Sequence, residues 1–401
     1  MKSWAVKLGK GIGAIKRDGV WRGGKRAAGS FFKLFRKVGS GDILFISSGV
    51  GDSARYRSDR QAEELSLHGF KCSVTVQDNP LLPRYADRFK IFIFQKTIFS
   101  KPVARLIEKI KAQKKEIIFE TDDLVYDPEY IRQTDFFRKM NALEKKQYET
   151  GVGSEILNND YTKTCVTATS FLADKLRQHG KQVFISKNKL ANYDVEVGEK
   201  ILEGKIERGD EKIRIGYFSG TASHDKDFET VKEALKYILE KHPQVELHLF
   251  GPLEFDDVYA KYDGRVKKHP FASWERHLEN IASVDVNISP LEVGNPFCES
   301  KSELKFIEAS IVSVPTVAAA TRTFKEAIED GVDGFFAGNT EEWIEKLEKL
   351  ILNGDLRRQM GEIAREKVLE NYTNKNSRNE EYYDFLKSKL KYETSVYSKY
   401  F

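Results

Sequence analysis

Residues 295–319, NPFCESKSELKFIEASIVSVPTVAA, hold the densest set of structural signals in this sequence. The stretch predicts a loop, then a helix, then a strand that begins just after Pro315. Ser300 and Glu303 have the spacing of a capping box, so we expect the helix to begin at Ser300. Apolar residues at helical spacing then mark a buried face, as Leu304 and Ile307 do.

Two lysines and one acid follow a neighbouring stripe of this predicted helix. Lys301, Lys305 and Glu308 are spaced at i, i+4 and i+7, which places them on one side. The N-terminal end of a helix carries partial positive charge, so its amides and the lysines suit a diphosphate. The acid, two turns further along, suits a pair of sugar hydroxyls.

The rest of the chain alternates between strands and helices. Before residue 190 we expect strands at 42–47, 71–76, 91–94, 116–120, 166–168 and 183–186, with helices at 56–68, 102–113, 135–148 and 170–179. A second alternation begins at residue 212, with strands at 212–218, 245–250, 266–269 and 286–288 and helices at 228–241 and 274–282. Such alternation predicts two doubly wound α/β domains with parallel sheets.

This alternation divides the 401 residues into five segments. They are a basic amphipathic leader (1–40), an N-terminal Rossmann-like domain (41–192), a linker (193–210), a C-terminal Rossmann-like domain (211–370) and a helical tail (371–401) that packs back on the N-terminal domain. Ligands of doubly wound sheets bind beyond the carboxyl ends of the strands. We therefore expect the two domains to face each other across a cleft, with residues 295–319 directed into it.

The composition suits a cytoplasmic protein with sizeable cores. Hydrophobic residues make up 40% of the chain, and no apolar run approaches the roughly 18 residues of a membrane span. The three cysteines, Cys72, Cys165 and Cys298, are far apart, odd in number and without metal-ligand spacing. These features favour a reducing compartment.

The positive charge is concentrated at the start of the chain. Residues 1–38 contain eleven Lys and Arg and one acid, a net charge of +10, whereas the whole chain carries +5. Aromatic residues lie among the cations, and Phe31, Leu34, Phe35 and Val38 have helical spacing. The leader suits either an anchor on an anionic membrane surface or a solvated arm. Because the basic character is local, we expect no nucleic-acid partner.

Four segments in order resemble the group 1 (family 4) retaining glycosyltransferases of GT-B architecture. They are residues 215–221 (IGYFSGT), 245–252 (VELHLFGP), 285–309, and 314–336 with its VPTVA and GVDGFF motifs. The resemblance covers about residues 42–370. It implies that the second domain binds a sugar nucleotide through Gly220, Thr221, His224, Lys226, Lys301, Ser302, Leu304, Lys305 and Glu308.

Within this resemblance, Glu308 holds the ribose hydroxyls, and the lysines and amides hold the diphosphate. His224 either contacts the donor or caps a helix, and Lys226 either reaches the diphosphate or is solvated. Much of the family carries a second glutamate, but the matching position here is Ser300. The Lys-Ser pair at 301–302 resembles a subgroup with that replacement.

Two further segments resemble the acceptor half of such enzymes. Residues 119–127 (FETDDLVYD) resemble a strand end of polysaccharide-cluster members, and residues 54–57 (ARYR) resemble a loop-to-helix entry. We expect Asp122 or Asp123 to lie near the acceptor hydroxyl or the donor sugar, as catalytic residues with Glu308. The aspartates also suit a metal site of a GT-A enzyme or a solvated acidic turn. Arg55 and Arg57 either meet an anionic lipid-linked acceptor or form salt bridges.

The sequence thus predicts an enzyme, a hexosyl- or glycosyltransferase of EC class 2.4. It would transfer a sugar from a nucleoside-diphosphate sugar to a growing cell-surface glycan or polyprenol-linked acceptor. Retention is implied by the family alone. We expect no metal and no cofactor, and a peripheral location at the inner face of the cell membrane. The alternatives are a catalytically inactive GT-B-like scaffold and a sugar-nucleotide epimerase.

Overall fold

The computed structural model describes residues 38–49, 51–134, 137–138, 140–205, 209–220, 225–253, 257–262 and 264–397. The chain divides into two compact units, one formed by residues 1–186 with 379–401 and the other by residues 187–378. Most of the predicted leader therefore lies outside the described part. None of the described helices combines the length and the apolar character that a membrane crossing requires.

The first unit is built on a parallel sheet of six strands in the order β2-β1-β3-β4-β5-β6. The strands are β1 (Ile43–Ser47), β2 (Cys72–Val76), β3 (Ile91–Gln95), β4 (Glu116–Thr121), β5 (Thr164–Thr167) and β6 (Gln182–Ile185). All residues of β1 and β3 are buried, as expected for strands covered on both faces. The strand order reverses between β1 and β3, which makes their carboxyl ends the expected ligand-binding edge.

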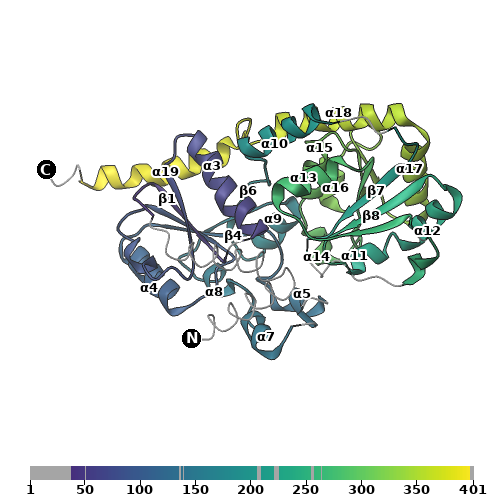
Figure 1. Ribbon diagram of the computed structural model, residues 1–401. Helices are drawn as coiled ribbons and strands as arrows, with labels where there is room; N and C mark the ends of the chain where they lie inside the picture. The colour runs from purple at the N-terminus through teal and green to yellow at the C-terminus, as the bar shows by residue number, and fades with distance from the viewer. Residues whose placement is uncertain are drawn as a thin grey trace. The chain divides into compact units, whose positions relative to one another are not determined.

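Helices cover this sheet and include the last helix of the chain. They are α2 (Asp52–Ala54), the π-helical turn η1 (Arg55–Asp59), α3 (Arg60–Leu67), η2 (Leu82–Arg84), α4 (Lys101–Ala112), α5 (Pro128–Gln133), α7 (Ala142–Tyr148), α8 (Ser154–Leu157), α9 (Ser170–Arg177) and α19 (Glu380–Tyr397). Helix α19, drawn in yellow in Figure 1, adds Tyr382, Tyr383 and Leu386 to the core of the first sheet. The hydroxyl of Tyr383 donates a 2.6 Å hydrogen bond to Glu64 on α3.

The second unit has its own parallel sheet, in the order β12-β11-β10-β7-β8-β9. Its strands are β7 (Ile213–Phe218), β8 (Val245–Phe250), β9 (Val266–His269), β10 (Val286–Ser289), β11 (Thr316–Ala319) and β12 (Phe335–Ala337). Counted from β7 as the first strand, this is the Rossmann order, with its switch point between β7 and β10. The two halves therefore differ in strand order, although both are doubly wound.

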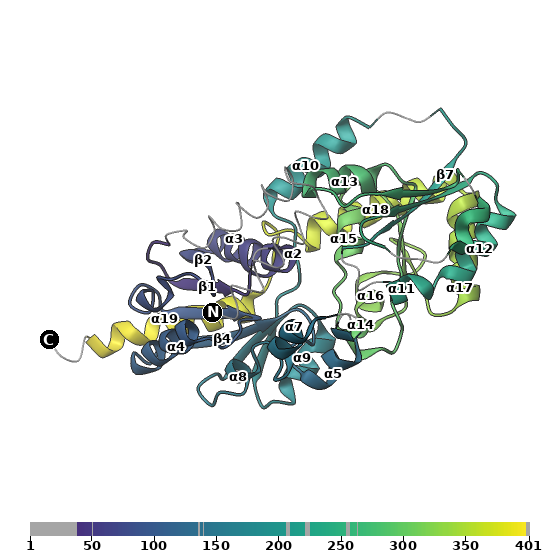
Figure 2. The same ribbon diagram turned by 60° about the horizontal axis from the view of Figure 1, so that its bottom comes forward.

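The helices of the second unit pack on both faces of its sheet. They are α10 (Asn192–Glu203), α11 (Asp225–Glu229), α12 (Lys232–Lys241), η4 (Asp257–Tyr262), α13 (Trp274–Ala282), α14 (Pro296–Glu299), α15 (Leu304–Ser310), α16 (Arg322–Ala327), α17 (Thr340–Leu352) and α18 (Gly354–Asn371). Figure 2 shows α12 and α17 side by side, and their residues are in contact. Buried Asn287 on β10 fixes α15 to the sheet, because its amide donates to Lys305 O at 3.2 Å.

Two local predictions differ from the structure. The segment expected to be a linker, 193–210, contains most of α10, and the second unit begins at Lys187. The fully buried residues of α10 are Asp194 and Gly198, and Val195, Val197 and Ile201 pack against the core while partly buried. The remainder of that segment includes residues 206–208, which lie outside the described part.

The predicted helix start at Ser300 is wrong. A short helix, α14, begins at Pro296, and α15 begins only at Leu304. The side chain of Asn295 caps α14 by accepting a 3.0 Å hydrogen bond from Phe297 N, while the Ser300 hydroxyl donates to Phe297 O at 2.7 Å. The Asn-Pro pair, a cap followed by proline at the first helical position, was the stronger signal.

Candidate functional site

Most of the residues predicted to bind a donor surround the switch point of the second sheet. Gly220 follows β7 and is exposed, and Lys226 is exposed on α11. Thr221 and His224 lie outside the described residues. The other members come from the segment after β10, which the fold places next to the end of β7 because these strands are paired.

Lys305 lies on α15 with its ammonium 4.4 Å from the centre of the Tyr217 ring. Burial lowers the pKa of Lys305 to about 8, although Asp227 and Glu308 act in the opposite direction. Desolvation disfavours the charged form of an ammonium, so an anion arriving beside Lys305 would raise this pKa again. The Lys305 side chain is therefore a partly buried cation near the strand ends, where it can bind an anion.

Glu308 lies one turn further along α15 and is only 9% exposed. Its Oε2 is 3.1 Å from Nε2 of His277 on α13. An ionised carboxylate can only accept, so Nε2 carries the proton and donates. The His277 ring meets Phe218, the last residue of β7, edge-on at 5.5 Å. The acid is thereby fixed close to the carboxyl end of that strand.

Lys301, Ser302 and Leu304 lie at and just before the start of α15 and are half-buried. The ammonium of Lys301 lies 4.2 Å from the centre of the Phe297 ring. The hydroxyl of Ser302 accepts a 2.8 Å hydrogen bond from Asn188. As the first two residues of the helix, Leu304 and Lys305 have amides without a partner inside it. These groups offer positive charge and hydrogen-bond donors on one short segment.

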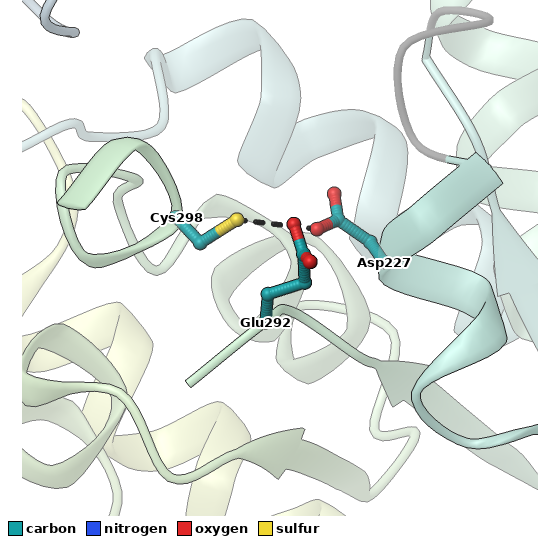
Figure 3. Close-up of side chains that lie close together, drawn as sticks. All are labelled: Asp227, Glu292 and Cys298. Atoms are coloured by element: carbon teal, nitrogen blue, oxygen red, sulfur yellow. Dashed lines mark hydrogen bonds between the residues drawn. The ribbon is translucent and has the colours of Figure 1, made fainter. Parts of the chain in front are cut away.

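An acid pair and a thiol lie beside this segment. One ligand atom from each of Asp227, Glu292 and Cys298 lies within 4.8 Å of those of the other two. Figure 3 shows the thiol of Cys298 pointing towards Asp227, to which it donates a 3.2 Å hydrogen bond. Burial and the two acids raise the pKa of Cys298. The protonated thiol therefore serves to hold Asp227, one of the acids that keep Lys305 charged.

The predicted acceptor-side aspartates follow β4 in the first unit. Lys96, directly after β3, lies 2.6 Å from Asp122 Oδ1 and 3.1 Å from Asp123 Oδ2. Ser53 donates a 2.8 Å hydrogen bond to the other oxygen of Asp122. Burial raises the pKa of Asp122, but Lys96, Arg57 and Ser53 outweigh it and lower this pKa to about 2. Asp122 is therefore ionised and fixed at the switch point between β1 and β3.

Arg57 is buried inside the first unit. Its side chain is 0% exposed, and its Nε lies 2.6 Å from Glu120 Oε1. A second nitrogen donates to Ser186 O at 2.6 Å. Of the two predicted roles, the structure shows the salt bridge for Arg57. Its position in the π-helical turn η1 directs the side chain into the first unit. Arg55 is partly exposed and pairs with Asp52.

Two residues that the sequence did not single out belong to these clusters. Lys96 could have been found by position, because it follows a predicted strand at the edge where ligands bind. It also has a left-handed backbone, with φ of 42°, which is uncommon outside glycine and often marks a functional constraint. His277 carries no comparable signal, since it lies within an ordinary amphipathic helix and meets Glu308 only through the fold.

Comparisons with known proteins agree with this arrangement. Residues 202–367 match the family model described as glycosyl transferases group 1. HepE of Anabaena, solved with UDP and glucose, is 15% identical and has a TM-score of 0.56, with 87% of this chain and 100% of that chain covered. Sucrose-phosphate synthase of Thermosynechococcus elongatus is 13% identical, with a TM-score of 0.57 and coverages of 88% and 99%.

A glycosyltransferase from Rickettsia africae is also similar, with 14% identity, a TM-score of 0.58 and coverages of 88% and 100%. At such identities the structures establish a common fold and no more. No curated protein sequence matches the chain. The predicted fold class is confirmed, and the family model supports the predicted family over residues 202–367. Residues 202–367 match the family model of the group 1 glycosyl transferases, and the two parallel six-stranded sheets match solved structures of the GT-B fold.

Proposed function

We propose that the chain transfers a sugar from a nucleoside-diphosphate sugar to a growing cell-surface glycan or a lipid-linked acceptor. The observation that carries the proposal is the segment after β10. It gathers Lys301, Lys305 and Glu308 at the switch point of a sheet whose sequence matches the group 1 family. Retention of anomeric configuration is carried over from the family resemblance.

The chemistry of the segment suits departure of a nucleoside diphosphate. Negative charge grows on the leaving group while an oxocarbenium-like centre forms on the sugar. Lys301 and the half-desolvated Lys305 would stabilise that charge, together with the amides of Leu304 and Lys305. Groups already oriented in a partly dry site stabilise such charge without reorganising. This supports a reaction that needs no divalent metal.

In this proposal the first unit supplies the acceptor side. Asp122 is ionised, and Lys96 and Ser53 fix its two oxygens. A carboxylate held in this way can accept a hydrogen bond from a sugar hydroxyl and orient it. The two aspartates would bind a divalent cation more weakly, because the Lys96 ammonium already neutralises one of their two charges.

The test is a panel of UDP-, GDP-, ADP- and dTDP-sugars, assayed for release of nucleoside diphosphate with and without glycan or polyprenol-linked acceptors. HepE was solved with UDP, so UDP-sugars are tried first. Release with modification of an acceptor, unchanged by EDTA, supports the proposal. Binding of nucleotides without turnover supports a scaffold instead, and inversion at C2 of UDP-GlcNAc supports an epimerase.

One observation favours the scaffold as the second candidate. Ser300 stands where much of the family has a glutamate, and it is fully buried with its hydroxyl bonded to Phe297 O. It therefore cannot replace a carboxylate at the substrate. If Ser300→Glu creates transfer activity in an otherwise inactive protein, the scaffold is the correct description of the natural chain.

We also propose that residues 1–38 attach the protein to an anionic membrane surface, on the strength of their eleven cations and interspersed aromatic residues. Vesicles of phosphatidylglycerol should bind the full chain but not a variant that lacks residues 1–38. The shortened protein should still hydrolyse a soluble donor. Vesicle binding that survives the deletion would refute the anchor.

A further inference from the structure

We propose that His277 positions the Glu308 carboxylate, and that this pair makes the site selective for ribonucleoside over 2′-deoxyribonucleoside diphosphates. The inference rests on the proposed function, because it takes Glu308 as the group that meets the ribose. It adds a positioning residue and a restriction on the donor: a sugar carried on UDP, GDP or ADP is accepted, and one carried on dTDP is not.

The pair is held by three separate elements of the second unit. His277 comes from α13, Glu308 from α15 and Phe218 from the end of β7. The imidazole meets the Phe218 ring edge-on, with ring centres 5.5 Å apart at 86°. The Trp274 ring also lies close to the imidazole, with ring centres 5.6 Å apart at 38°. These rings limit how the imidazole can turn, so its Nε2 stays directed at the carboxylate.

The hydrogen bond from His277 fixes the direction of one oxygen of Glu308. The Nε2–Oε2 distance is 3.1 Å, and the two side chains are only 26% and 12% exposed. A carboxylate has about four lone-pair directions, of which His277 occupies one. With its plane fixed, the carboxylate can accept from two neighbouring hydroxyls at once, and the 2′- and 3′-hydroxyls of a ribose are such a pair.

Selectivity follows from partial burial. A bound nucleoside would cover the carboxylate further, and a missing 2′-hydroxyl would leave an acceptor without its partner. An unsatisfied buried polar group is unfavourable, and sites built to bind a hydroxyl reject the analogue that lacks it. Without His277 the carboxylate could rotate towards solvent, and the penalty for the missing hydroxyl would fall.

The experiment is isothermal titration of the full chain with UDP and 2′-deoxy-UDP, or with the GDP and ADP pairs if uridine is not the matching base. The variants are His277→Phe, which keeps a ring of similar size, and His277→Gln, whose amide nitrogen can reach the position of Nε2. Glu308→Gln reports the ratio when the carboxylate itself is lost. The control is His242→Gln, because His242, directly after α12, forms a similar pair with Glu348 on α17, at 2.8 Å.

The informative quantity is the ratio of the two dissociation constants, which a general loss of stability would not change. We expect the wild type and the His242→Gln control to prefer the ribonucleotide at least tenfold. His277→Phe should bring the ratio to within threefold of the Glu308→Gln value, and His277→Gln should restore most of it. Should His277→Phe fail to fold, His277→Asn replaces it, because its shorter amide cannot reach Glu308.

Two results would overturn the inference, and they can be told apart. An unchanged ratio in folded His277→Phe, or a wild type that binds both nucleotides equally, refutes the role of the pair while leaving the proposed function standing. If none of the nucleoside diphosphates binds the wild type, the proposed function fails and the inference fails with it.

Discussion

The ammonium of Lys96 lies 2.6 Å from Asp122 Oδ1, joining the ends of strands β3 and β4. The two carboxylates beside Lys96 outweigh burial and raise the pKa of its ammonium, while the pKa of Asp122 falls to about 2. Lys96 has a left-handed backbone, with φ of 42°. Both charges therefore persist at neutral pH, in the position proposed for the acceptor.

Lys96→Met should destabilise the protein and impair transfer. It leaves Asp122 and Asp123 without their cation, and breaking a largely buried pair of this kind costs roughly 2 to 4 kcal/mol. Asp122 has a lowered pKa, so its contribution is present above pH 3.8 and disappears as the pH falls towards 2. Urea unfolding at several pH values should show the largest effect of the substitution above pH 4. Lys109→Met, at an exposed position on α4, is the control, and equal effects would contradict this account.

Arg57→Met should destabilise the first unit more at pH 8 than at pH 6. Burial raises the pKa of Glu120 to about 7, although Arg57 acts to lower it. A raised carboxyl pKa means that stability falls as the pH rises from 4.5 through 7, and without Arg57 the charge above pH 7 is uncompensated. The expected loss at pH 8 is about 3 to 5 kcal/mol, measured by urea unfolding. The double variant Arg57→Met, Glu120→Gln should recover much of the lost free energy of unfolding. No recovery would mean that Arg57 does not stabilise the unit by compensating the charge of Glu120.

The affinity for a nucleoside diphosphate should fall as the pH rises above about 8. Burial lowers the pKa of Lys305 to about 8, so the free site loses this cation from there upwards. Between pH 8 and about pH 10.5 the unfolded chain binds more protons than the native one. Lys305 therefore makes the stability of the protein rise with pH in that range. Titration calorimetry at pH 7, 8 and 9 measures the affinity. Lys305→Arg, which keeps its charge, should flatten the profile; an equally steep decline would exclude Lys305 as the cause.

Gly251→Ala should cost considerably more stability than Gly264→Ala. Both glycines have positive φ, at +92° and +75°, so both substitutions carry the strain of a left-handed backbone. A Cβ at position 251 would lie 2.0 Å from Ser219 O, whereas none of the described atoms lies within 4 Å of one at 264. We expect about 1 kcal/mol at position 264 and at least twice that at 251. Equal melting temperatures would show that the turn after β8 adapts.

The sequence was sufficient for the strands because buried parallel strands are short apolar runs with clear ends. The strand expected at 91–94 is Ile91–Gln95, and the one expected at 245–250 is Val245–Phe250. A family model supports the resemblance over residues 202–367, whereas the assignment to the retaining enzymes stays a prediction. Helix starts were less certain, because two local signals competed between Asn295 and Glu303.

The clusters could not be read from the sequence, because they depend on pairing between distant elements. Lys96 and Asp122 meet because β3 pairs with β4, and His277 meets Glu308 because α13 packs on α15. Arg57 was left between two roles, and only the π-helical turn decides that its side chain is buried. The donor-binding roles that the resemblance implies for the other residues stay proposals.

The most direct test of the central claim compares the wild type with Glu308→Ala in binding and turnover of the matching nucleoside-diphosphate sugar. A thermal-shift panel of UDP, GDP, ADP and dTDP first identifies the base, because a bound ligand raises the melting temperature by mass action. We predict that Glu308→Ala folds normally but loses more than tenfold in affinity or turnover. A folded Glu308→Ala variant with full affinity and full activity would contradict the placement of the donor at α15.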